Sequence, residues 1–401
     1  MKKIYLLAVA LAGTLLTSCS DFLDKVPLVV PSSETFLTNQ SAVTNYVNGL
    51  YIALPSAGAY GMGIMGEEKN SDNMVAMVYD RRMNGELQES IGGVTEWQKG
   101  YQNLRSVNYF LEYYKVPAAE ETAEVLSLKG EAYFFRAYWH YYLLTKFGSI
   151  PVMDKFWDGN ATVGGLQIPA RDRSAVAQFI LDDLKAAKEL LYSRSKYQGL
   201  RICKEAAMVM AMRVALFEGT WEKYHKGTDF AAAEYKSDDF LQQVLTLGDE
   251  LFQMGITLNT KENDKSVKNI DDAYGNLFNS KDLSATQEVL FWKKYSIADN
   301  LVHSLNTNLS SGMCDAEGPA GLSQSLLDNY LSVDGNFIDP TAAKFKDFNE
   351  SFKDRDGRLL ATVMHSDCKY KSMTVKGAKK MLYSNDFKQE VLEEDDFAKT
   401  D

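Results

Sequence analysis

The feature that most constrains the fold of this chain is a long helical pattern after Pro117. Apolar or small residues recur there at intervals of three and four positions, the period of one face of an α-helix; they are Leu126, Gly130, Phe134, Ala137, Tyr141 and Leu144. Lys146 lies in the expected last turn, Gly148 suits the C-terminal cap, and Pro151 prevents continuation. The pattern therefore predicts one continuous helix with a buried stripe.

The helical period recurs along most of the chain. A second helix is expected from about Ser174 to Leu191 and a third from about Lys204 to Phe217; the third is apolar nearly all round and is expected to be deeply buried. Further helices are expected near residues 42–50, 97–113, 238–254 and 322–331. Strand patterns are few and short. The sequence predicts a mostly α fold of tetratricopeptide-like helical pairs, without a clean repeat of about 34 residues.

A change of composition interrupts this pattern between about Gly255 and Gly321, where Asn, Asp, Ser and Gly become frequent and aromatic residues are isolated. This predicts a loop-rich insertion at about residues 255–321, a common position for ligand contacts. We expect this insertion to lie on a helical scaffold, with residues 19–401 forming a single domain.

The N-terminus has the pattern of a lipoprotein signal peptide. Two lysines precede an apolar run from Ile4 to Leu16, which is too short to span a bilayer. The tetrapeptide Leu16-Thr17-Ser18-Cys19 resembles a bacterial lipobox, so residues 1–18 are predicted to be a signal peptide and Cys19 the diacylated mature N-terminus. More than one acyl chain is enough for stable anchoring. An ordinary signal peptide that happens to contain a cysteine is the less favoured interpretation.

Charge and cysteine content restrict the function further. The chain carries 43 Lys and Arg against 54 Asp and Glu, a net charge of −11, and no basic run that would favour nucleic acid. The charge fits a ligand that is neutral or held by local contacts. Beyond Cys19, the irregular spacing of Cys203, Cys314 and Cys368 indicates neither a disulfide framework nor a metal site. Cys203 is expected to be a small buried hydrophobic residue.

A block of motifs within and after the long helix is the most specific in the chain. It comprises Gly130-Glu131-Ala132-Tyr133-Phe134-Phe135-Arg136-Ala137, Tyr141-Tyr142-Leu143 and Phe147-Gly148-Ser149-Ile150-Pro151. It resembles the Glu-Ala, Arg-Ala, Tyr-Leu and Gly-x-Ile-Pro block of the SusD/RagB family. Other motifs that resemble this family follow the same order, namely Cys19 to Asp24, Gly49-Leu50-Tyr51, Gly66-Glu67, Ser71-Asp72-Asn73, Trp97, Tyr101, Leu104, Asn108, Ile180 to Leu184, Arg213 to Phe217, Leu327 to Tyr330, Asp334-Gly335 and Lys353 to Asp356.

The resemblance extends from Cys19 to about Leu360 and implies a mostly helical, non-enzymatic binding protein. Family chains usually continue further, so a truncated or unusually short member is expected. The resemblance also implies a surface glycan-binding lipoprotein, lipid-anchored in the outer membrane, that captures oligosaccharides, or sometimes peptides, and passes them to a SusC-like TonB-dependent transporter. The alternative is a helical-repeat envelope lipoprotein that binds peptide or protein partners, and glycan binding would separate the two.

Catalytic, metal and cofactor motifs give no competing prediction. The run Gly61 to Gly66 matches a dinucleotide fingerprint, but it has no strand before it and no helix after it. Asp354-Arg355-Asp356 is better interpreted as an ion-paired turn than as a calcium loop. The four histidines are scattered, and the carboxylates of Glu67 and Glu68 are weak evidence for a glycosidase in a chain with 54 acidic residues. We expect no enzyme activity, metal or cofactor.

Two segments combine aromatic side chains with polar or charged ones, as sugar binding requires. An aromatic ring stacks on the C–H face of a sugar, and Asn, Asp and Arg form hydrogen bonds with its hydroxyls. The segments run from Asn70 to Arg82 and from Tyr274 to Tyr295, the latter with Phe278. We predict that the ligand-binding residues are Asp72, Tyr79, Arg81 and Trp292. Core packing is an equal alternative for Trp292.

The first segment generates a direct test. Replacing Tyr79 or Arg81 by alanine is expected to weaken glycan binding without lowering the melting temperature, because residues in a ligand-binding loop contribute little to the core. Affinity-gel retardation and thermal unfolding of both variants check this. Unchanged affinity in both variants would exclude this segment as a site.

Overall fold

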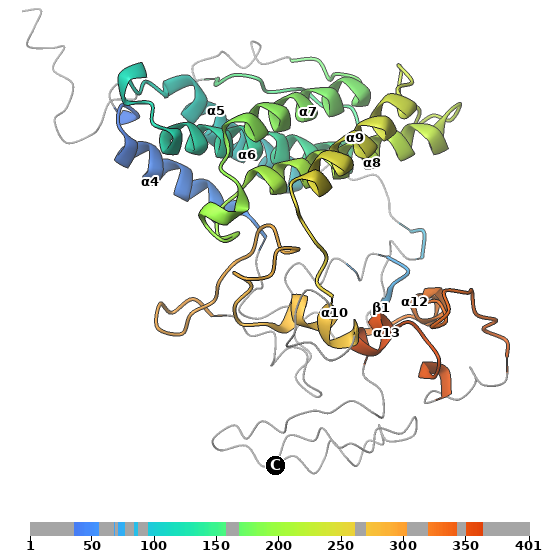
Figure 1. The fold of residues 1–401 in the computed structure, drawn as a ribbon. Coiled ribbons are helices and arrows are strands. Elements are labelled where there is room, and N and C mark those ends of the chain that lie inside the picture. The colour runs from blue at the N-terminus through green and yellow to red at the C-terminus, as the bar shows by residue number, and fades with distance from the viewer. Residues whose placement is uncertain are drawn as a thin grey trace, which may run out of the picture.

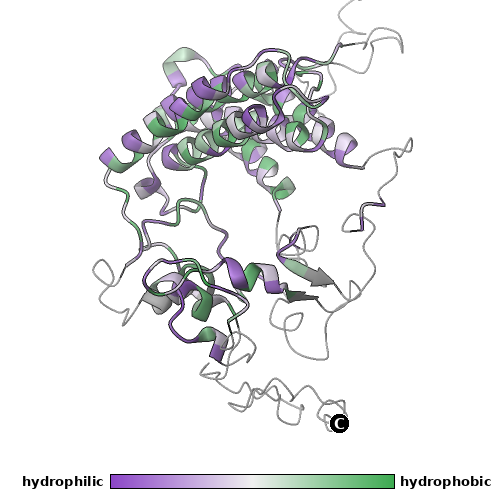
Figure 2. Cartoon of the chain, turned by 90° about the vertical axis from the view of Figure 1, so that its right-hand side faces the viewer, coloured by the Kyte–Doolittle hydropathy of each residue, from purple (hydrophilic) through white to green (hydrophobic). Residues whose placement is uncertain are grey.

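The structure is a computed structural model that describes residues 36–55, 68, 71–76, 84–86, 95–157, 168–260, 270–302, 320–342 and 350–363. Cys19, Tyr79 and Arg81 lie outside the described residues, so their predicted roles stay predictions. Two lobes are visible, a bundle of long helices and a lobe of short elements (Figures 1 and 2). Within the described residues, no helix is both long and apolar enough to cross a membrane.

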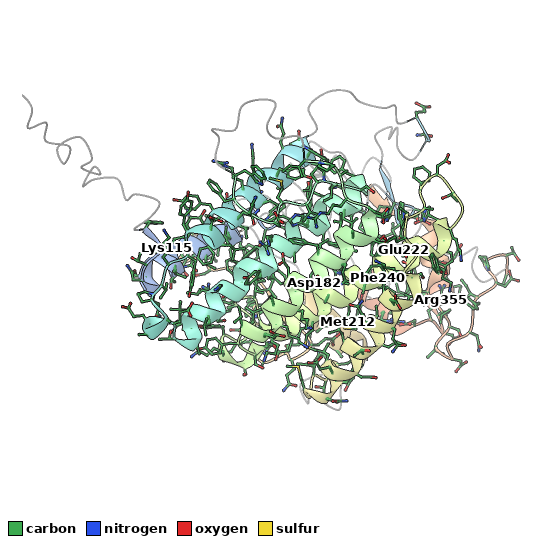
Figure 3. All side chains as sticks on the ribbon, turned by 90° about the horizontal axis from the view of Figure 1, so that it is seen from above. Lys115, Asp182, Met212, Glu222, Phe240 and Arg355 are labelled. Carbon is green, nitrogen blue, oxygen red and sulfur yellow. The ribbon has the colours of Figure 1, made fainter. Side chains whose placement is uncertain are left out.

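The helical lobe consists of α4 (Gln40–Leu50), α5 (Thr95–Tyr113), α6 (Ala123–Phe147), α7 (Arg173–Leu190), α8 (Lys204–His225) and α9 (Ser237–Gln253). From α5 onward, each helix packs against the next one in the chain. Seen from above, they lie side by side, with Lys115 near one end of the row and Phe240 toward the other (Figure 3). Short 3-10 turns occur at Tyr51–Ala53, Ala118–Glu120, Arg194–Lys196 and Glu350–Phe352. The prediction of a mostly helical fold is confirmed.

Helix α6 lies at the centre of this lobe. The Thr122 hydroxyl accepts the N–H of Val125 at its start, and Gly148 ends it with a φ of 70°, a conformation that favours glycine. The predicted stripe is largely buried, but residues off it, such as Phe135 and Trp139, are buried too. The reason is that α4, α5 and α7 cover different sides of α6.

Two details differ from the sequence-based expectations. Helix α8 continues to His225 and is not buried all round, since Leu216 remains 48% exposed. Its neighbouring helices are α7 and α9, which leave one side of α8 open. The segment predicted to be loop-rich contains helix α10 (Ile270–Asn279), which packs against α13 (Gly357–Thr362). Such a short helix depends on tertiary packing, which its own sequence does not reveal.

The second lobe is held by short elements from distant parts of the chain. Strand β1 (Met74–Ala76) pairs antiparallel with β2 (Ala320–Leu322), with Met74 opposite Leu322. Ser323 caps α12 (Gln324–Asn329), which occupies part of the helix expected near residues 322–331. A small core of Leu327, Phe352 and Leu359 joins α12 to α13. A segment between α4 and α5 therefore meets, in this second lobe, residues that follow α9 in sequence (Figure 1).

Polar family-motif residues of α5 hold the segment 148–157 against the helices. The Asn108 side chain on α5 donates to the carbonyl of Met153 over 2.8 Å, and the Tyr101 hydroxyl donates to the carbonyl of Pro151 over 2.8 Å. These bonds satisfy carbonyl groups in a segment without regular structure. The motif residues are therefore structural in this part of the molecule.

Arg136 on α6, a residue of the motif block, contacts both α7 and the segment that follows α6. Its guanidinium forms a bidentate pair with Asp183 on α7, with Nε–Oδ2 and Nη2–Oδ1 distances of 2.7 Å. Its Nη1 donates to the carbonyl of Asp154 over 2.9 Å. Both side chains of the ion pair are largely buried, so neither charge is strongly screened by water.

A second buried network joins α4 to the entry of α8. The Arg201 guanidinium pairs with both carboxylate oxygens of Glu131 over 2.9 and 2.8 Å, and the Tyr51 hydroxyl donates to the same carboxylate over 2.7 Å. Tyr51 also accepts the backbone N–H of Ile202 over 3.0 Å. The Gly-Leu-Tyr motif, through Tyr51, and the Glu-Ala motif, through Glu131, are therefore joined by a direct hydrogen bond.

Neighbouring aspartates on α7 offer a matched test of the Arg136 pair. Asp183→Asn is expected to destabilise the protein by about 3 kcal/mol, because it leaves the Arg136 guanidinium buried without a counterion. Asp182→Asn is expected to change stability by less than about 0.5 kcal/mol, since Asp182 is exposed. Denaturant unfolding of both variants measures the difference. Equal stabilities would show that the pair contributes no net stabilisation.

His140 on α6 gives the stability a pH dependence. Its Nδ1 lies 2.9 Å from the Arg136 carbonyl, and its Nε2 accepts the N–H of Met153 over 3.1 Å, an arrangement that suits the neutral ring. Burial, aided by nearby arginines, lowers the pKa of His140 from 6.5 to about 3. The unfolded chain binds a proton below pH 6.5 and the folded chain does not, so stability decreases as the pH falls from 6.5 toward 3.

At pH 5 the expected loss from this one group is about 2 kcal/mol. The variant His140→Gln retains a hydrogen-bond acceptor but cannot titrate, so its stability should decrease less between pH 7 and pH 5. Urea unfolding of both proteins at the two pH values measures the difference. Parallel pH profiles for the wild type and the variant would contradict the assignment.

Candidate functional site

Of the predicted ligand-binding residues, Asp72 lies in the exposed turn before β1. Its carbonyl accepts the hydroxyl of Ser323, and the carbonyl of Asn73 accepts the backbone N–H of Ser323 over 2.9 Å. These bonds fix the turn beside the start of α12 and leave the Asp72 side chain at the surface of the second lobe.

Trp292 lies where the second lobe meets the helical lobe. Its residue is 9% exposed, its indole N–H donates to the carbonyl of Gln198 over 2.9 Å, and its backbone N–H donates to Gly199 over 3.0 Å. A ring covered in this way has little surface on which a sugar can stack. The geometry therefore favours the packing role that the sequence left open.

Helix α10 presents an aromatic pair in the second predicted segment. Tyr274 and Phe278 stand four residues apart, and their ring centroids lie 5.1 Å apart at an interplanar angle of 62°. Tyr274 is half-buried, whereas Phe278 is 74% exposed. The helix is oriented by Ala273, which is fully buried. Phe278 therefore has a ring open to solvent and fixed by a neighbouring ring.

Helix α13 places a charged pair beside this aromatic pair. The Asp356 carboxylate caps α13 by accepting the N–H of Arg358 over 2.9 Å, and it pairs with the Arg358 guanidinium over 2.5 Å. The hydrogen bonds from Arg358 lower the pKa of Asp356. The pKa of Arg358 is raised chiefly by Asp356 and slightly by the nearby Tyr274 and Tyr330 hydroxyls.

We call these five residues, Tyr274, Phe278, Tyr330, Asp356 and Arg358, the α10–α13 surface. The sequence had identified Tyr274 and Phe278 only as members of a loop, and the prediction of an ion-paired turn at Asp356 is confirmed. Their proximity was not foreseen, because α10 and α13 are about eighty residues apart in the chain and meet through packing alone. The four-residue spacing of the two rings was the available signal.

The chemistry of this surface suits binding. Phe278 offers an aromatic face, and Asp356 and Arg358 offer acceptors and donors for hydroxyl groups. Within the described part of the chain, no group of three or more His, Cys, Asp and Glu residues is placed to hold a metal ion.

Comparison with known families identifies the chain. A family model described as "Starch-binding associating with outer membrane" matches residues 21–216, and one described as "SusD family" matches residues 278–398. The chain belongs to the SusD/RagB family. Proteins of the SusD/RagB family are non-catalytic binding proteins, as the sequence led us to expect.

Individual relatives of the SusD/RagB family agree in fold. A SusD-like protein from Bacteroides fragilis has 21% identity and a TM-score of 0.61 over 84% of this chain and 62% of its own. A SusD-like carbohydrate binding protein from the same species has 17% identity and a TM-score of 0.62 over 85% of this chain and 63% of its own. The SusD-like protein P25 of Formosa agariphila is 23% identical over 51% of this chain and 41% of its own length. The chain thus spans less than two thirds of these relatives.

Proposed function

We propose that this protein is a surface lipoprotein that binds oligosaccharides and passes them to a SusC-like TonB-dependent transporter. Membership of a family whose model is described as starch-binding and associated with the outer membrane supports the class of ligand and the location. The lipobox at Cys19 supports a lipid anchor. The observation that carries the proposal is the α10–α13 surface, because it combines an exposed ring with a charged hydrogen-bonding pair.

Binding at this surface follows from the two chemical sides of a sugar ring. The C–H face of the sugar packs on the exposed Phe278 ring, and Tyr274 holds that ring through an edge contact with a centroid distance of 5.1 Å. The Asp356 and Arg358 side chains lie at the rim and exchange hydrogen bonds with hydroxyls. Each part alone is weak, so affinity depends on both being held in place.

The surface is held before a ligand arrives, which reduces the entropy cost of binding. Helix α13 is anchored by the fully buried Leu359 and α10 by its packing on α13. Arg355, just before α13, donates to the carbonyls of Ser351 over 3.0 Å and Tyr330 over 2.8 Å. These bonds fix Tyr330 and the start of α13 relative to one another.

Local charge favours a neutral glycan over an acidic one. Three cations of the second lobe already pair with carboxylates, namely Arg358 with Asp356, Lys353 with Glu350 and Lys294 with Asp282. An acidic sugar would compete with those carboxylates for the cations. We therefore propose neutral hexose polymers as the ligand class, with binding that depends little on salt.

Transfer to a transporter is the part of the proposal that rests most on family membership. The lipidated full chain should co-purify with an outer-membrane barrel from its own membranes. Isolation of the anchored protein without any barrel, under conditions that retain other membrane complexes, would contradict this part and leave glycan binding untouched.

Two exposed phenylalanines allow a matched test of glycan binding. In the mature chain with Cys19→Ser, Phe278→Ala is expected to weaken binding of the preferred neutral polysaccharide by about tenfold, which corresponds to about 1.4 kcal/mol. The lost contact is the stacking of the sugar on the ring. Retardation in affinity gels that contain a panel of neutral and acidic polysaccharides measures the change.

The control is Phe252→Ala on α9, because Phe252 is 67% exposed and lies in the helical lobe. It should leave retardation unchanged. Equal effects of the two substitutions would assign binding elsewhere, and the absence of retardation of the folded wild type by every polysaccharide would refute the glycan-binding proposal.

A further inference from the structure

One arginine connects the helical lobe to the chain that leads away from α10. Arg194, in the turn between α7 and α8, is buried. Its Nε donates to the carbonyl of Val289 over 2.7 Å, and its Nη2 lies 3.0, 3.1 and 3.0 Å from the carbonyls of Leu283, Ser284 and Thr286. A single side chain therefore gathers four carbonyls of an irregular segment.

The turn that carries Arg194 is itself rigidly held. The Glu205 carboxylate at the start of α8 accepts the backbone N–H of Arg194 over 2.8 Å and the hydroxyl of Ser193 over 2.9 Å. Glu205 is buried, so it holds the turn from within the lobe. Glu205 thus binds the backbone of Arg194, while the Arg194 guanidinium bonds to carbonyls of the segment 283–289.

A second set of contacts fixes the same segment a few residues further on. Trp292 bonds to Gln198 and Gly199, as described above, and the Cys203 thiol donates to the carbonyl of Leu290 over 3.4 Å. Gln198 and Gly199 have positive φ values of 53° and 79°, so the turn is shaped to receive the segment at some conformational cost. An added Cβ at Gly199 would lie 3.0 Å from the Trp292 ring and 3.1 Å from the Leu290 carbonyl.

Arginine suits this role better than any other side chain. Its planar guanidinium has several N–H donors in fixed directions, whereas a lysine ammonium is a point charge on a flexible stem. Carbonyl dipoles of the loop then solvate the charge in place of water. Loss of the guanidinium would remove the donor to the carbonyls of Ser284 and Val289, whereas those of Leu283 and Thr286 still accept the backbone N–H groups of Thr286 and Val289. The segment would then be held less firmly against the helical lobe.

We propose that Arg194 is a positioning residue for ligand binding at the α10–α13 surface. We call the contacts of Arg194, Gln198, Gly199 and Cys203 with the segment 283–292 the joint. Helix α10 ends at Asn279, only four residues before Leu283, so the joint fixes the C-terminal end of the helix that carries Phe278. The guanidinium does not touch the ligand in this scheme. It acts through the segment 283–292, and the inference rests on the glycan-binding function proposed above.

The experiment is a double-mutant cycle in glycan affinity between Arg194→Gln and Phe278→Ala. Arg194→Gln alone is expected to weaken binding about fivefold, because the Phe278 ring is no longer held in register with α13. In the Phe278→Ala background the same substitution should have little further effect, since the ring through which it acts is absent. Hydrogen exchange should become faster in residues 280–292 and stay unchanged in α5 to α7.

Two further variants keep the test decisive. Arg213→Gln is the matched control, because Arg213 is an exposed arginine on α8 that lies near Tyr141 of α6; the variant should bind as the wild type does. Gly199→Ala disturbs the joint from its other side without removing a charge or a ring, so it should weaken binding in the same direction. It replaces Arg194→Gln in the cycle if that variant does not fold.

The outcomes separate this inference from the proposed function. If the wild type binds a glycan and the joint variant binds it equally well, Arg194 is a structural residue only. Additive effects in the cycle would also overturn the inference, because they indicate a loss unrelated to Phe278. If the folded wild type binds no glycan at all, the proposed function fails and, with it, the premise of this inference.

Discussion

The ion pair between Arg136 and Asp183 is the contact on which the helical lobe depends. It joins α6 to α7 with two 2.7 Å bonds, and the same guanidinium holds Asp154 in the segment that follows α6. A buried pair of this kind contributes less net stability than its short distances suggest, because both ions lose their hydration. We expect its main effect to be the selection of one arrangement of α6 and α7, since a misaligned alternative leaves a charge unpaired and largely buried.

Buried and half-buried arginines have different partners in the helices and in the irregular chain. In the helical lobe, Arg136 and Arg201 pair with carboxylates on neighbouring elements, because helix backbones already satisfy their own carbonyls. In the irregular chain, Arg194 and Arg355 donate instead to backbone carbonyls. Irregular segments leave such carbonyls without partners, so one guanidinium replaces several hydrogen bonds that a sheet or helix would supply. Side-chain hydrogen bonds from these two arginines therefore help to order the loop-rich lobe.

This difference between the two lobes places most of the family motifs away from the candidate surface, to which only Tyr330 and Asp356 among the motif residues belong. The motif residues of the SusD/RagB family in the helical lobe, such as Tyr51, Glu131 and Asn108, make buried contacts and are unavailable to a ligand. Phe278 and the pair of Asp356 and Arg358, which form the candidate surface, belong to α10 and to α13 with its N-cap, in the second lobe (Figure 1). A rigid helical scaffold therefore supports a surface whose chemistry can vary independently of the fold.

The sequence by itself determined the helical lobe, because an apolar stripe of helical period and local capping residues such as Gly148 are properties of neighbouring residues. It also indicated Tyr274 and Phe278 as candidates, through residue type alone. Only the tertiary structure decided that the 270–279 segment is helical, that α10 meets α13, and that Arg358 lies beside Tyr274. These contacts join residues far apart in the chain, and their stability comes from buried area and from hydrogen bonds to Arg194 and Arg355. No local pattern encodes such partners, since the same residues without those partners would remain a solvated loop.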